Sequence, residues 1–232
     1  MSATAVSIAS GQKLRFWQTT VGKKAVMAVT GFILFGFLIG HLAGNLQIFL
    51  PPEKINHYAE LLHSAPALLW AARLTLLVSV ILHMWAALVL TKVQWDARPV
   101  KYFRKENLNS SYASRTMIWG GVIIAAFVIF HLLHFTFGSV HPNFDPKNVY
   151  NNVIIGFQSI PVSVFYMVAM VLLCMHLYHG LWSMFQSLGL DHPKYTPWLK
   201  RFAKVFAYLI AIGNISIPAA VLAGFLKPVA GV

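Results

Sequence analysis

Five apolar runs, each long enough to cross a bilayer as a helix, constrain the fold of this chain more than any other feature. A membrane-spanning helix needs about 20 predominantly apolar residues. We place the spans at about residues 24–49, 67–92, 116–138, 161–187 and 203–226. Proline and charged residues gather between the runs, as expected of connections between helices. The sequence therefore predicts an all-α integral membrane bundle of five helices, forming one domain over residues 1–232.

The composition agrees with a membrane location. Of the 232 residues, 58% are hydrophobic and only 10% are charged, whereas a soluble domain has about 25% charged residues. The net charge of +12 would suggest a nucleic-acid partner for a soluble chain. In a membrane protein, Lys and Arg beside the spans report orientation instead, so we expect no nucleic acid. The single Cys174 excludes a disulfide framework and Cys-rich metal motifs.

Basic residues are distributed unequally between the two faces that alternating spans define. Four of them are on the face that holds the first and third connections and the C-terminus: Lys54, Arg73, Lys147 and Lys227. Fourteen are on the other face: Lys13, Arg15, Lys23, Lys24, Lys92, Arg98, Lys101, Arg104, Lys105, Arg115, Lys194, Lys200, Arg201 and Lys204. The positive-inside rule then predicts a cytoplasmic N-terminus and an outside C-terminus. We expect a multi-pass protein of the cell inner (cytoplasmic) membrane. A short interfacial helix is expected over residues 56–64.

Histidines occupy four of the five apolar runs, at His41, His83, His131/His134 and His176/His179. Ionisable side chains inside a membrane are costly and mark functional sites. At about 1.5 Å of rise per residue, His41 and His131 lie roughly 10–12 Å from the outer ends of their spans. By the same measure, His83 and His179 lie roughly 12–13 Å from the inner ends of theirs. The topology thus predicts two layers, each with two histidines from different helices.

Two neutral imidazoles that face each other across a bundle commonly hold haem iron with both axial positions filled. Two such haems, one on each side of the midplane, would carry electrons across part of the bilayer. Each histidine taken alone could instead be a hydrogen-bonded packing residue. On spacing alone, His134 could replace His131 as a ligand, and His176 could replace His179.

Three segments carry a resemblance to a known family. They are residues 37–42 (FLIGHL), 130–135 (FHLLHF) and 176–189 (HLYHGLWSMFQSLG). They resemble the dihaem cytochrome b membrane anchor of succinate:quinone oxidoreductases, the succinate dehydrogenase or fumarate reductase type with one five-helix anchor subunit. The resemblance covers about residues 16–224. It implies a distal, outer haem b bound by His41 and His131, and a proximal, inner haem b bound by His83 and His179.

The resemblance also implies partners and a reaction. A flavoprotein subunit carrying FAD would oxidise succinate to fumarate, and a subunit with iron–sulfur clusters would relay the electrons. This chain would pass them through its haems to a quinone, expected to be menaquinone, as part of a respiratory chain, and would itself hold no catalytic residue for succinate. The basic inner connection over residues 98–115 would dock the iron–sulfur subunit, unless it is only a solvated loop.

A quinone site on the outer side, near the distal haem, also follows from the resemblance. Quinone chemistry needs a hydrogen-bond donor for each carbonyl, and the candidates on that side are Tyr58, His63, His134, Asn45 and Gln47. Tyr58 and His63 could instead be interfacial anchors, and an inner site near the proximal haem stays open. Arg73 could pair with a propionate of the distal haem or extend to the membrane interface.

One position departs from the family, and two other classes of protein stay open. Some family members carry a buried Glu two residues before the fourth-span ligand, and Leu177 stands there in this chain. A proton path built on that carboxylate is therefore not expected. The chain could instead be the cytochrome b of another respiratory complex, such as a membrane hydrogenase or formate dehydrogenase. It could also be a transporter or a haem-free anchor whose histidines relay protons.

Overall fold

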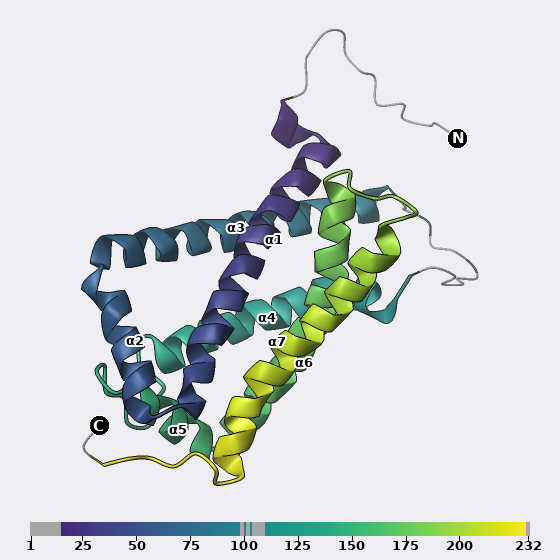
Figure 1. Ribbon diagram of the computed structural model, residues 1–232. Coiled ribbons are helices and arrows are strands. Elements are labelled where there is room, and N and C mark those ends of the chain that lie inside the picture. The colour runs from purple at the N-terminus through teal and green to yellow at the C-terminus, as the bar shows by residue number, and fades with distance from the viewer. Residues whose placement is uncertain (1–14, 98–99, 101–102, 104–109, 231–232) are drawn as a thin grey trace, which may run out of the picture.

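The computed structural model describes residues 15–97, 100, 103 and 110–230, and its described elements are all helical (Figure 1). Five helices are long and apolar enough to cross a membrane: α1 (Thr20–Asn45), α3 (Pro66–Asp96), α4 (Tyr112–Phe135), α6 (Ile160–Ser187) and α7 (Thr196–Leu222). The predicted all-α class with five spans is therefore confirmed, and the chain has the architecture of a multi-pass membrane protein.

The helix ends differ from the predicted spans for local reasons. Helix α7 begins at Thr196 rather than at residue 203, because Pro197 lies in its first turn, where a missing N–H costs nothing. Helix α1 ends at Asn45, and a short 3₁₀ helix, η2 (Leu46–Phe49), continues the apolar run. Gly189 ends α6 with a φ of +80°, which lets the Leu190 N–H donate to the Phe185 carbonyl at 2.9 Å.

Two short helices lie at the end of the bundle where α1 and α4 finish (Figure 1). Helix α2 (Pro52–Ser64) contains the predicted interfacial segment. Helix α5 (Val149–Gln158) was not predicted; the side chain of Asn148 caps it by accepting from the Asn151 N–H at 3.0 Å. The two helices are joined where the Tyr150 N–H donates to the Asn56 side chain at 2.9 Å.

Helix α6 lies at the centre of the packing, against α7, α4 and α1. Helix α1 also packs against α3, which it crosses, and α6 and α7 run side by side (Figure 1). In contrast, α1 and α4 are not among the helix pairs that pack along one another in the described part of the chain, and neither are α3 and α6. These two pairs are therefore the diagonals of the four histidine-bearing helices.

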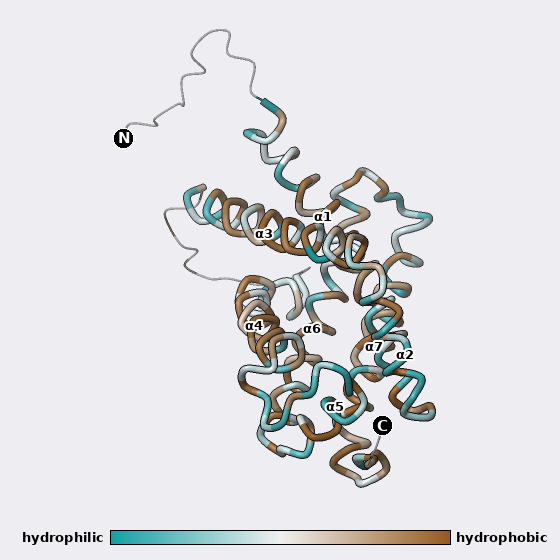
Figure 2. Tube along the Cα trace, turned by 90° about the vertical axis from the view of Figure 1, so that its left-hand side faces the viewer, coloured by the Kyte–Doolittle hydropathy of each residue, from teal (hydrophilic) through white to brown (hydrophobic). Residues whose placement is uncertain are grey.

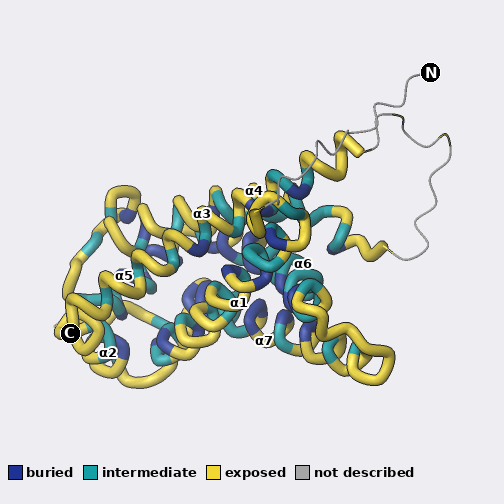
Figure 3. Tube along the Cα trace, turned by 90° about the horizontal axis from the view of Figure 1, so that it is seen from above, coloured by how far each residue is buried: buried dark blue, intermediate teal, exposed yellow. Residues whose placement is uncertain are grey.

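Burial follows this arrangement, with buried residues turned toward neighbouring helices and exposed residues turned outward (Figure 3). The largest core cluster lies at the α5 end and includes Ile48, Phe127, Ile154, Phe157 and Tyr166. The exposed faces of the long helices remain apolar, whereas polar residues gather on α2 and in the connections (Figure 2). Apolar outward faces are what a helix needs to contact lipid acyl chains.

A substitution at Gly156 tests the packing of α5 on α4. A Cβ atom at Gly156 would lie 2.9 Å from Cε1 of His134 and 2.9 Å from Cε1 of Phe135. Because His134 is only 1% exposed, its ring has little room to move. We expect Gly156→Ala to lower the free energy of unfolding by about 1–3 kcal/mol, measured by chemical unfolding in mixed micelles.

Gly36→Ala is the matched control, because no atom lies within 4 Å of a Cβ built at Gly36. This variant should have the wild-type stability or a slightly higher one, since alanine has a higher helix propensity than glycine. Equal stability of the two variants would contradict the close contact between α5 and α4.

Candidate functional site

Four histidines meet in two pairs inside the bundle. The first pair joins His41 of α1 to His131 of α4, with ring centroids 5.8 Å apart and ring planes at 88°. The second pair joins His83 of α3 to His176 of α6, with ring centroids 6.2 Å apart and ring planes at 57°. Each pair connects two diagonal helices, so the rings meet in the interior that all four helices share.

The two pairs form separate layers along the bundle. Gly31 of α1 faces His83, and Gly121 of α4 faces His176; a Cβ atom on each glycine would lie 3.4 and 3.9 Å from Cε1 of the respective ring. Each glycine precedes, by ten residues, the histidine that its own helix gives to the first pair. Ten residues of helix rise about 15 Å. The two pairs are therefore separated along the bundle by a distance of about that size.

Hydrogen bonds at the Nδ1 atom of His83 fix the tautomer of its ring. This nitrogen lies 3.1 Å from the Met27 carbonyl oxygen and 3.3 Å from the Thr30 hydroxyl. A carbonyl only accepts, so Nδ1 of the neutral ring carries the hydrogen, and Nε2 keeps its lone pair. The Thr30 hydroxyl gives its own hydrogen to the Val26 carbonyl at 2.7 Å, which leaves its oxygen free to accept. The lone pair of His83 is therefore on Nε2, the nitrogen through which the ring would bind a metal.

Helix α6 presents His176, rather than His179, to His83. The ring of His179 instead lies edge-on to Trp182, with centroids 6.0 Å apart, and the Lys200 ammonium of α7 lies 4.5 Å from the centre of the Trp182 ring. Three residues along a helix change the direction of a side chain by about 60°. The sequence favoured His179 as the partner of His83, and the structure brings the second choice into that place.

A cavity of about 190 Å³ adjoins the second pair. It lies between α4 and α6 and includes Thr116, Trp119, Gly120, Leu172 and His176 in its lining. The Nδ1 atom of His176 is buried and has no hydrogen-bond partner in the described part of the chain. A buried ring nitrogen without a partner is costly, which marks this position as one where a group not belonging to the chain would bind.

The first pair has a different environment, which involves Tyr166 of α6. The Tyr166 hydroxyl lies 3.4 Å from Nδ1 of His131 and 3.1 Å from Nδ1 of His134. Tyr166 is 6% exposed and His134 is 1% exposed. His134 therefore contacts Tyr166, and its ring also lies 5.1 Å from that of His141 in the connection to α5. The structure places His131, and not His134, against His41.

The residues predicted to bind quinone are not among the described residues that line the cavity beside His176 or the polar cavity between α2 and the segment before α5. Tyr58 packs on Gly44 of α1, where its ring would lie 2.7 Å from an added Cβ atom. His63 is exposed, and its Nδ1 donates to the Ala59 carbonyl of its own helix at 2.7 Å. Asn45 and Gln47 are half-buried at the end of α1, and His134 lies deeper, under α5.

Arg73 and the end of the predicted docking loop are among the described residues. The Arg73 guanidinium lies over the ring of Trp70 on the same helix, 5.2 Å from its centre. Arg73 precedes His83 by ten residues, the same spacing that separates the two layers on α1 and α4. Most of the loop over residues 98–115 lies outside the described residues, and at its end the Arg115 guanidinium lies 6.0 Å from the centre of the Tyr112 ring.

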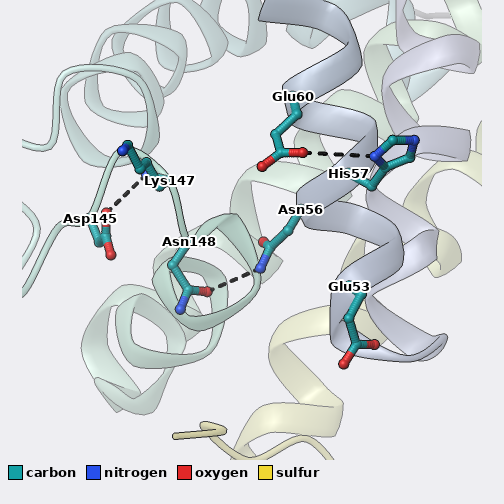
Figure 4. A pocket seen from close by; sticks show the side chains of 7 residues that line it. All are labelled: Glu53, Asn56, His57, Glu60, Asp145, Lys147 and Asn148. Carbon is teal, nitrogen blue, oxygen red and sulfur yellow. Dashed lines mark hydrogen bonds and ion pairs between the residues drawn. The ribbon is translucent and has the colours of Figure 1, made fainter. Parts of the chain in front are cut away.

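A polar cavity of about 490 Å³ lies between α2 and the segment before α5 (Figure 4). Its lining residues are Glu53, Asn56, His57, Glu60, Asp145, Lys147 and Asn148. The Asn56 side chain donates to Asn148 at 3.5 Å, and the His57 and Glu60 side chains lie 3.8 Å apart (Figure 4). Because the His57 and Glu60 side chains are 79% and 75% exposed, this ion pair adds little stability. The contact between Asn56 and Asn148 attaches α2 to the start of α5.

Sequence reasoning missed Thr30, Gly31, Gly121 and Tyr166, which surround the two pairs. A usable signal was the spacing of ten residues, which recurs on α6 between Tyr166 and His176. A second signal was the glycine that lies ten residues before His41 on α1 and before His131 on α4. Neither pattern is a known motif, so only the assembled bundle gives it meaning.

Comparisons with protein-family models, characterised proteins and solved structures find no match for this chain.

The donor set of each pair suits a metal that brings ligands of its own. No group of three or more His, Cys, Asp or Glu placed to hold a metal ion occurs among residues 15–97 and 110–230. A structural zinc ion needs four protein ligands, whereas haem iron needs only two axial ones. Two metal–nitrogen bonds of about 2.0 Å would hold two imidazole centroids roughly 6 Å apart. Both pairs fit that spacing.

Proposed function

We propose that this chain is the dihaem cytochrome b anchor subunit of a succinate:quinone oxidoreductase in the cytoplasmic membrane. The main support is the meeting of four intramembrane histidines in two pairs, with ring centroids 5.8 and 6.2 Å apart. Haem iron with two histidine ligands transfers single electrons and has no open position for a further ligand. An anchor of this type needs two such centres, one in each layer.

His41 and His131 would hold one haem, and His83 and His176 the other. The second assignment replaces His179 with His176, because His176 is the ring that faces His83. The Met27 carbonyl would orient His83 and keep its Nε2 free, as the outer partners of metal-binding histidines do. Gly31 and Gly121 leave space beside the second pair that a larger side chain would fill.

The wider complex is supported by the sequence resemblance and by charge. The segment over residues 176–189, which carries the resemblance, contains the α6 half of the second pair. Basic residues gather at the end of the bundle where α1 begins: Arg15, Lys23, Lys24, Lys92, Arg115, Lys194, Lys200, Arg201 and Lys204. With the N-terminus in the cytoplasm, this end would meet an iron–sulfur subunit, which in turn would bind a flavoprotein with FAD.

The cavity beside His176 favours a quinone site near the second pair rather than the predicted outer site. It adjoins a histidine pair, and its lining combines Thr116 and His176 with apolar side chains. Quinone head groups are flat and apolar with two polar carbonyls, so this mixture suits them. Menaquinone remains the expected type from the resemblance.

Single substitutions of the histidines test the assignment of the two haems. We expect His83→Ala and His176→Ala to abolish the same haem, because each would remove one of the two side chains that would hold it. His41→Ala and His131→Ala should abolish the other haem. The measurement is the reduced-minus-oxidised absorption spectrum of each purified variant, with haem quantified as pyridine haemochrome.

His179→Ala is the matched control, one helical turn from His176 on α6. It should keep both haems at about the wild-type ratio. Loss of the His83 haem in His179→Ala, with retention in His176→Ala, would contradict the assignment drawn from the structure.

Subunits that purify with the tagged chain test the type of complex. We expect a flavoprotein and an iron–sulfur protein, and reduction of the chain's haems when succinate is added to the complex. A partner containing nickel or molybdenum, with no response to succinate, would assign the chain to a hydrogenase or a formate dehydrogenase instead.

A further inference from the structure

A buried tyrosine hydroxyl connects the His41–His131 pair to a third histidine. Tyr166 of α6 contacts Nδ1 of His131 at 3.4 Å and Nδ1 of His134 at 3.1 Å. His131 and His134 are neighbours on α4, and both turn toward the same hydroxyl. In the described part of the chain, these two ring nitrogens are the hydrogen-bond partners of Tyr166.

The surroundings of Tyr166 make these two contacts important. Its ring packs edge-on against Phe127 and Phe157, with centroids 5.0 and 4.9 Å apart, and lies near Phe130 and Phe135. A hydroxyl in such an apolar cluster costs free energy unless it is hydrogen-bonded. The aromatic packing also fixes where the hydroxyl lies, because the ring has little freedom to rotate away.

The number of hydrogens on these groups determines the direction of the hydrogen bonds from His131 through Tyr166 to His134. The Tyr166 hydroxyl has one hydrogen, so it donates to one ring nitrogen and accepts from the other. If His131 binds iron through Nε2, its Nδ1 carries a hydrogen and must be the donor. Tyr166 then accepts from His131 and donates to Nδ1 of His134, and His134 carries its hydrogen on Nε2.

We propose that Tyr166 is a positioning residue for His131, one that fixes the tautomer and the orientation of this ring and couples it to His134. The inference rests on the proposed function, since the direction of these hydrogen bonds follows from His131 being an iron ligand. It also gives His134 a role outside iron binding, as the acceptor of the Tyr166 hydroxyl.

The second pair shows what is distinct about this arrangement. There, His83 donates to a backbone carbonyl, a fixed acceptor that no side-chain substitution removes. In the first pair, the acceptor is a side-chain hydroxyl whose strength depends on a further donor bond to His134. The acceptors beside the two rings therefore differ: His83 has the fixed Met27 carbonyl at 3.1 Å as well as the Thr30 hydroxyl at 3.3 Å, whereas a side-chain substitution at Tyr166 removes the acceptor of His131.

Tyr166→Phe removes the acceptor while keeping the aromatic ring. His131 then loses its Nδ1–H partner and becomes a less basic ligand, which disfavours the ferric state of its haem. We expect the reduction equilibrium constant of that haem to rise about tenfold, the worth of one hydrogen bond, which is about 59 mV for one electron. The haem at His83–His176 should keep its wild-type potential. The measurement is a spectroelectrochemical redox titration.

Two further variants make the result specific. Tyr178→Phe, also on α6 and half-buried, is the matched control and should shift neither potential. His134→Leu should keep both haems and raise the potential of the same haem by less than Tyr166→Phe does, because Tyr166 still accepts from His131. If the Tyr166→Phe variant fails to retain haem, the haem potentials of the His134→Leu variant alone test the positioning role.

Unchanged potentials in Tyr166→Phe and His134→Leu, with both haems present, would overturn the positioning role and leave the proposed function standing. Loss of a haem in His134→Leu would also overturn it, because His134 would then be a ligand. Wild-type protein without haem would overturn the proposed function, and this inference with it.

Discussion

An imidazole inside a membrane span needs a polar partner, and this requirement connects the helices of the bundle. Lipid offers no hydrogen bond, so a ring nitrogen turned toward lipid would remain unsatisfied. Here, each of four spans turns one histidine inward, where it meets a ring from the diagonally opposite helix. The diagonal helices are not among the pairs that pack along one another in the described part of the chain, so the histidine rings meet across the interior between them.

The two layers are chemically different although both consist of paired histidines. In one, the Met27 carbonyl fixes the tautomer of His83, and glycines lie close to both rings. In the other, Tyr166 and His134 form a side-chain network under α5, inside the largest core cluster. Two haems bound here would sit in different hydrogen-bonding environments, and unequal potentials would give electron flow a preferred direction between the layers.

Much of this arrangement could be predicted from sequence, because membrane spans give a strong and simple signal. The five apolar runs, the four histidine-bearing helices and the two layers follow from hydropathy and from the rise of a helix. The choice between His176 and His179 does not, because the two residues differ by only about 4.5 Å in depth and by about 60° in direction. That direction is set by the packing of Leu177, Leu181 and Met184 against neighbouring helices.

Helix α5 and the role of Tyr166 could not be predicted from the sequence, for other reasons. Helix α5 has only ten residues, and its apolar face is recognisable only beside the core that it covers. Tyr166 reads as one more aromatic residue in a span, and its function depends on two histidines that are 35 and 32 residues away in sequence. Long-range contacts of this kind leave no local pattern.

The most direct test is the number of haems per polypeptide in the purified wild-type chain. We would measure it by pyridine haemochrome against protein quantified by amino-acid analysis, after expression with adequate haem supply. Two non-covalent b haems per chain are expected, one for each histidine pair. One haem would mean that one pair is only a packing contact, and none would contradict the assignment of this chain as a cytochrome.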